Sequence, residues 1–118
     1  MKTKVNNLKK ILILNAALLI LITIFWGCTK TSSSGPGPNE IFIQGMAFNP
    51  GTITVAAGTT ITWTNKDGVA HRPTSNTGLF DSGNMSSNTT FSFNFPAAGT
   101  FHYFCSIHPS MTGTVIVN

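Results

Sequence analysis

The sequence predicts an all-β domain, a small antiparallel Greek-key β-sandwich that occupies residues 40–118. Apolar residues in this region alternate with polar ones at a period of two, in short runs rich in Thr, Val, Ile and Phe, which is the pattern of half-buried strands. Clusters of Gly, Pro, Asn and Asp separate the runs, and no stretch between them has a helical period. About seven or eight such strands fit two packed sheets.

The alternating residues follow one another along the chain as short sets. They are Ile41 and Ile43; Ile53 and Val55; Ile61 and Trp63; Phe91, Phe93 and Phe95; Phe101, Tyr103 and Cys105; Val115 and Val117. Because residues two apart on a strand point to the same face, each set is expected to line the core. Such a small core has no disulfide to brace it, so a bound metal is expected to add to its stability.

Residues 1–27 are predicted to be a signal segment. Four lysines in the first ten positions precede an apolar run over residues 11–26, which is shorter than the roughly 20 residues that a spanning helix needs. Gly27 followed by Cys28 resembles the bacterial lipobox, in which the cysteine is lipidated and becomes the mature N-terminus. An uncleaved membrane anchor is the alternative. Either way the domain is exported, periplasmic or at the cell surface, and tethered to a membrane.

Residues 28–39 are predicted to be a flexible linker, because Thr, Ser, Gly and Pro cannot build a core. Beyond it the domain is electrically neutral, since the formal charge of +4 belongs to the lysines of the first ten residues. A neutral domain has no electrostatic footprint for nucleic acid, so nucleic acid is not an expected partner.

The run CSIHPSM gathers three donor side chains on one turn, with Cys105, His108 and Met111 each three residues apart. Cys105 ends a strand on its core face, and Pro109 prevents a helix from following. If Cys28 is lipidated, Cys105 is a lone thiol in an oxidising compartment, where an unpaired thiol needs a role. The pattern therefore predicts a metal site.

His71 is the candidate fourth donor, in a loop 34 residues before Cys105 that neighbouring strands can bring to the same pole. One thiolate, two imidazoles and a thioether suit copper that cycles between Cu(I) and Cu(II), with a weak axial methionine to tune the potential. A structural zinc site would use more thiolates or histidines. The expected cofactor is one copper ion.

These motifs resemble the cupredoxins, the blue copper proteins, and within them the plastocyanin and amicyanin-like group. The resemblance runs from IFIQGMAFNPG through AHRP to GTFHYFCSIHPSMTGTVIV. It implies a cupredoxin-like sandwich with a type 1 copper site whose ligands are His71, Cys105, His108 and Met111. It also implies that electrons pass through the exposed ring edge of His108, within an apolar patch. The expected patch members are Ile107, Pro109, Pro73 and Ala70.

One residue departs from the family pattern. Many members have Asn directly after the first histidine ligand, where it ties the two ligand loops together, and this chain has Arg72. Contacts around the ligands tune a metal, so the potential and the local surface charge are expected to differ. Asn65 lies upstream and is not expected to replace the missing side chain. Arg72 and the turn Lys66–Asp67 are expected to be solvated.

Other donor-type and aromatic residues are expected to be structural. His102 and Phe104 alternate with Cys105 along their strand and should face the surface, with a second electron path as the alternative role for Phe104. Met46 and Met85 sit in apolar patterns and should pack in the interior.

The predicted function is one-electron transfer through a mononuclear copper site, with unidentified redox proteins as partners and a monomer as the expected state. The chain is not expected to be an enzyme, because copper oxidases and nitrite reductases need further histidines and only His102 is left over. The alternatives are a copper carrier or chaperone that delivers metal, and a metal-free adhesive or structural β-sandwich.

Overall fold

The computed structural model describes residues 34–118. The predicted signal segment 1–27 and most of the predicted linker lie outside the described residues. The strands are β1 (Glu40–Ile43), β2 (Phe48–Asn49), β3 (Thr52–Val55), β4 (Thr59–Asn65), β5 (Pro73–Ser75), β6 (Thr90–Phe95), β7 (Gly99–Cys105) and β8 (Thr112–Val117). No helix among the described residues is long and apolar enough to cross a membrane.

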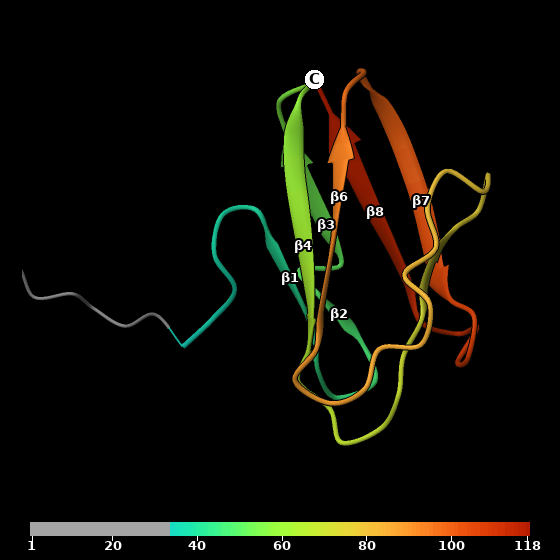
Figure 1. The fold of residues 1–118 in the computed structure, drawn as a ribbon. Helices are drawn as coiled ribbons and strands as arrows, with labels where there is room; N and C mark the ends of the chain where they lie inside the picture. The colour runs from blue at the N-terminus through green and yellow to red at the C-terminus, as the bar shows by residue number, and fades with distance from the viewer. Residues whose placement is uncertain (1–33) are drawn as a thin grey trace, which may run out of the picture. The chain divides into compact units, whose positions relative to one another are not determined.

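The strands form two four-stranded sheets, with strand orders β2-β1-β4-β6 and β3-β8-β7-β5. Figure 1 shows the strands of both sheets running along a common axis, as in an aligned sandwich. The predicted all-β sandwich with seven or eight strands is therefore confirmed. Asn39, the last residue of the predicted linker, is bonded to the first sheet, since its carbonyl accepts from the Thr62 amide at 3.0 Å.

The sandwich is mixed in strand direction where purely antiparallel sheets were predicted. β1 runs parallel to β4, and β3 runs parallel to β8, while the other ladders in residues 34–118 are antiparallel. A parallel neighbour needs a crossover connection, and here the chain crosses to the opposite sheet and returns. Period-two alternation reports which face of a strand is buried and carries no information about the direction of its neighbour.

The core between the sheets contains the alternating residues together with Phe48, Phe80, Met85 and Met111. Trp63 and Tyr103 are each at most 1% exposed and meet edge to face, with ring centroids 5.5 Å apart. Phe91, Phe93 and Phe101 are half-buried and pack against the core from its margin. Aromatic pairs at such distances add to the free energy of area burial. Cys105, the last residue of β7, belongs to this same packed core.

Candidate metal centre

Three predicted donors converge at one end of the sandwich. His71 comes from the loop between β4 and β5, Cys105 ends β7, and His108 lies in the loop between β7 and β8. The two Nδ1 atoms of His71 and His108 are 3.2 Å apart, and the Cys105 Sγ lies 3.7 and 3.8 Å from them. His71 and Cys105 are fully buried and His108 is half-buried, so the centre opens to the surface on the His108 side.

These distances fit one ion held by all three atoms. Metal bonds of about 2.0–2.1 Å to imidazole nitrogen and about 2.3 Å to thiolate sulfur, spread at 120°, place nitrogen and sulfur about 3.8 Å apart. The two nitrogen–sulfur distances are 3.7 and 3.8 Å. The predicted convergence of loops 34 residues apart is thus found, with a spacing that needs little rearrangement.

The fourth predicted donor, Met111, is buried with 4% of its surface exposed. Its backbone closes the loop, since its carbonyl accepts from the Cys105 amide at 3.0 Å and its amide donates to the His108 carbonyl at 3.0 Å. Met111 therefore belongs to the same turn as two of the converging donors. Its role as a ligand stays a prediction.

His71 is held on two sides. Its backbone exchanges two hydrogen bonds with Met85, at 3.1 and 2.8 Å. Its Nε2 lies 3.0 Å from the Asp67 carboxylate, which leaves Nδ1 facing Cys105 and His108. A metal-binding histidine usually donates its second ring N–H to a carboxylate or carbonyl in this way, which fixes the tautomer and the ring orientation.

The Asp67 carboxylate also organises the loop between β1 and β2. It accepts from the amides of Gly45 at 2.7 Å and Met46 at 3.0 Å, and both residues have positive φ. Burial raises the pKa of the Asp67 carboxyl, but the amides of Met46 and Gly45 and the His71 ring together hold that pKa below its ordinary value. Asp67 was expected in a solvated turn and is instead a bridge between a donor and a neighbouring loop. A carboxylate four residues before a candidate histidine is the signal that could have pointed to it.

The Asn65 side chain is fully buried and braces the loop between β4 and β5, which carries His71. Its amide nitrogen donates to the carbonyls of Val69 at 2.8 Å and Met85 at 2.9 Å, and its oxygen accepts from the Asp67 amide at 2.9 Å. These bonds join the His71 loop to Met85, and none of the three reaches the loop that carries Cys105.

The Arg72 side chain turns away from the centre and forms a fork on Asp81. The Arg72 Nε and a terminal nitrogen donate to the two Asp81 oxygens at 2.8 and 2.7 Å, with both side chains a little over two-fifths exposed. The Arg72 fork, with help from the Gly83 amide, lowers the pKa of Asp81 to about 2. Arg72 was expected to be simply solvated, and no pattern along the chain indicates its partner nine residues on.

We expect the Arg72–Asp81 fork to make the stability of the metal-free protein depend on pH. A carboxyl whose folded pKa is below the unfolded value of 3.8 stabilises the fold above pH 3.8, and this contribution is lost as the pH falls through about 2. Urea unfolding from pH 6 to pH 2 should therefore show a gap between the native chain and Asp81→Asn that closes as the pH falls. A gap that stays constant over this range would contradict the assignment.

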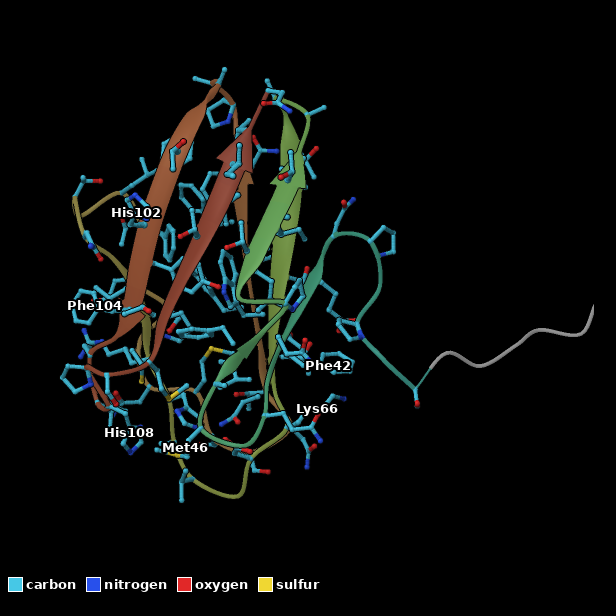
Figure 2. The ribbon with its side chains drawn as sticks, turned by 180° about the vertical axis from the view of Figure 1, so that it is seen from behind. Phe42, Met46, Lys66, His102, Phe104 and His108 are labelled. Atoms are coloured by element: carbon cyan, nitrogen blue, oxygen red, sulfur yellow. The ribbon has the colours of Figure 1, made fainter. Side chains whose placement is uncertain are left out.

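Large apolar side chains are exposed in the two loops that carry the donors and in the β1–β2 loop that Asp67 contacts. Figure 2 shows His108 and Met46 at the same end of the sandwich, with His102 farther along β7. Val69 is 50%, Met46 47% and Ile107 39% exposed. Of the predicted patch members, Ile107, Pro109 and Ala70 are exposed as expected. Pro73 was wrongly included: it is fully buried, because it starts β5 opposite Cys105 and faces the core.

The other structural expectations divide. His102 is exposed, with its Nδ1 3.1 Å from the Thr114 hydroxyl, as predicted for a surface residue. Met85 is buried in the core, as predicted. Met46 was wrongly expected to pack, because its positive φ of 60° in the β1–β2 turn directs it outward.

Comparison with known proteins agrees with this geometry. A family model described as a cupredoxin-like domain matches residues 17–117. The chain belongs to the cupredoxin family. Amicyanin-alpha from Methylorubrum extorquens is 34% identical over 69% of this cupredoxin and 72% of its own length. Plastocyanin from Scenedesmus fuscus is 31% identical over 61% of this chain and 87% of its own. A purple cupredoxin from Nitrosopumilus maritimus superposes with a TM-score of 0.62 at 31% identity, covering 67% of this chain and 98% of that one.

The prediction of one copper ion as the cofactor of this cupredoxin is confirmed by its family together with its donor set. Two imidazoles and one thiolate lie within 4.8 Å of one another, and a methionine is buried in the same turn. Thiolate and thioether favour Cu(I), and imidazoles also accept Cu(II). The residues present therefore fit copper in both oxidation states.

Asp67→Asn is expected to raise the reduction potential of the cupredoxin. If His71 is a ligand, as predicted, the carboxylate makes its ring more basic and so favours Cu(II), and the amide retains an acceptor without the negative charge. A tenfold weaker hold on Cu(II) relative to Cu(I) corresponds to a rise of about 59 mV. Voltammetry measures it, with Glu40→Gln as control, because the hydrogen bonds of the Glu40 carboxylate go to Gly37 and Thr64, which are not candidate copper ligands. An unchanged or lower potential would contradict the prediction.

Proposed function

We propose that this cupredoxin is a one-electron carrier whose copper is held by His71, Cys105, His108 and Met111. The observation that carries the proposal is the spacing of the three converging donors, at 3.2, 3.7 and 3.8 Å. Backbone bonds from Met85 and Met111 hold two of these donors. Copper supplies the one-electron redox couple, and ligands that barely move between its two oxidation states keep the reorganisation energy of transfer low.

The half-buried His108 ring is the proposed route for the electron. Its Nδ1 faces the centre, the exposed Val69 and Ile107 belong to the two donor loops, and the exposed Met46 lies at the same end of the sandwich. A neutral domain with an apolar patch at its redox centre suits a partner that docks by apolar contact, so we expect association to depend weakly on salt.

The proposal does not include catalysis by the isolated domain. Within residues 34–118 the converging histidine and cysteine donors account for one ion, and the remaining histidine, His102, pairs with Thr114 on the sheet surface. We therefore propose no second, catalytic copper.

Copper delivery is the alternative function, and the burial of the donors favours electron transfer over it. His71 and Cys105 are both fully buried, so a metal acceptor could approach only from the His108 side. A site built to hand over copper would be expected to offer its thiolate to the partner, whereas an electron crosses a buried thiolate without the ion leaving.

We further propose that the domain is exported and tethered near a membrane, through lipid on Cys28 or through residues 1–27 as an uncleaved anchor. The support is the sequence: a lysine-rich start, an apolar run, Gly27–Cys28 and a Ser, Gly and Pro-rich linker. A monomer in the periplasm or at the cell surface is the expected state. Mass spectrometry of the mature N-terminus distinguishes the lipidated from the uncleaved form.

One experiment separates the two functions. The unit Ser33–Asn118, which is compact by itself, is first mixed with copper. The product is then examined by voltammetry and by competition with a copper chelator. Electron transfer predicts a reversible one-electron wave and slow release of copper. An irreversible wave with rapid release to the chelator would favour delivery, and failure to bind copper would favour a metal-free sandwich.

A further inference from the structure

We propose that Thr74, acting with Ser106, positions the hydrogen-bond donor of the copper thiolate. The two hydroxyls replace the loop tie that an asparagine after the first histidine provides in many cupredoxins. The inference rests on the proposed function, because it assigns Cys105 as the thiolate ligand. Neither residue touches the donor atoms, so both act through the backbone of Arg72.

The Arg72 backbone contacts both donor loops. Its amide donates to the Cys105 Sγ at 3.3 Å, and its carbonyl accepts from the Ser106 amide at 3.0 Å. Because Arg72 directly follows His71, its backbone links the loop of His71 to the loop that begins at Cys105. The position of its amide therefore decides how well the sulfur is hydrogen-bonded.

The Thr74 hydroxyl fixes this backbone from the other side. Its Oγ1 donates to the Arg72 carbonyl at 3.0 Å, and the Thr74 and Ser106 hydroxyl oxygens lie 3.3 Å apart. Ser106 Oγ also lies 3.5 Å from the Arg72 carbonyl. Thr74 belongs to β5, which pairs with β7, so the hydroxyl is placed by the sheet rather than by a loop. The two donor loops are therefore still connected by hydrogen bonds, although this chain lacks the asparagine side chain that connects them in many cupredoxins.

The substitution by arginine becomes tolerable for the same reason. The Arg72 side chain is not needed between the loops and forms its fork on Asp81, whose carboxylate also accepts from the Gly83 amide at 2.9 Å. The fork holds Arg72 from the outside while Thr74 and Ser106 hold its carbonyl. Three loops are thereby fixed around one amide.

A hydrogen bond to a metal thiolate tunes the redox potential of the metal. It withdraws electron density from sulfur, which weakens the thiolate as a donor to Cu(II) and favours Cu(I). If Thr74 holds the Arg72 amide in place, loss of its hydroxyl should lower the potential and shift the sulfur-to-copper absorption band. Affinity for Cu(I) should fall about tenfold relative to affinity for Cu(II), at the low end of the effect that residues behind metal ligands have.

The test compares the copper-loaded full chain with Thr74→Val, which keeps the shape and removes the hydroxyl, and with Thr74→Ser, which keeps the hydroxyl. We expect a lower potential, a shifted band and faster amide exchange at Ser106 in Thr74→Val, and recovery in Thr74→Ser. Thr62→Val is the matched control, because it removes a similar hydroxyl–hydroxyl hydrogen bond, the one between Thr62 and Ser92 at 2.8 Å on the other sheet. It should change neither the potential nor the band.

An unchanged potential and band in Thr74→Val would overturn the inference, and so would equal shifts in Thr62→Val. If Thr74→Val does not fold, Ser106→Ala replaces it, because Ser106 is exposed and its removal leaves the sheet intact. It should shift both readouts in the same direction by a smaller amount, and no shift would also overturn the inference. A native chain without an intense thiolate band would instead overturn the proposed function, whatever the variants do.

Discussion

Cys105→Ser is expected to abolish the intense visible absorption of the copper-loaded protein. That band is a charge transfer from thiolate sulfur to Cu(II), and a serine hydroxyl, which stays protonated, cannot replace the thiolate. Affinity for copper should fall by more than the roughly 10–100-fold that changes behind the ligands cause. The measurements are the visible spectrum after addition of Cu(II) and a titration against a chelator of known affinity.

The fold itself should survive this substitution. Serine is smaller than cysteine, and its oxygen can accept the Arg72 amide that now donates to Sγ. Loss of colour with an unchanged thermal transition of the metal-free protein would then report on the ligand alone. His102→Ala is the control, because His102 lies on the same strand and outside the centre, and it should retain the full band. A blue Cys105→Ser protein would disprove the assigned site.

The donors could be predicted because their pattern is local. Cys105, His108 and Met111 are spaced at three residues on one turn, and the alternation of β7 places Cys105 on the core face. His71 was a weaker candidate, because it stands alone in a distant loop and only the need for a fourth donor, and then the family resemblance, pointed to it. The packing of two sheets that brings it to 3.7 Å from Cys105 depends on contacts between distant strands.

The residues behind the donors could not be predicted, because their roles depend on pairing between strands and loops. Thr74 contacts Ser106 only because β5 pairs with β7, and Asp67 contacts Met46 only because β1 lies beside β4. Short polar side chains of this kind are common in turns, so composition gives them no distinguishing mark. Pro73 shows the same limit, since a proline beside a loop histidine looks exposed until its strand partner is known.

Gly113 is the position at which a single methyl group should do the most damage to the fold. It lies directly opposite Tyr103 in the ladder of β7 and β8. The Tyr103 ring covers it so closely that a Cβ at this position would overlap the ring carbons and the hydroxyl. The ring cannot move aside easily, because it is 1% exposed and packs edge to face against Phe48 and Trp63, with centroids 4.7 and 5.5 Å away.

Gly113→Ala is therefore expected to lower the free energy of unfolding by about 3 kcal/mol, the upper part of the range for overpacked cores. For a domain of this size that corresponds to a fall in Tm of roughly 12–24 °C. Gly51→Ala is the matched control: its Cβ would meet only the Phe48 carbonyl, at 3.7 Å, and it should cost far less. In a Tyr103→Leu background, where the ring is gone, the added cost of Gly113→Ala should largely vanish in a double-mutant cycle. Equal costs in the two backgrounds would show that the ring is not the cause, and that backbone freedom at Gly113 accounts for the effect.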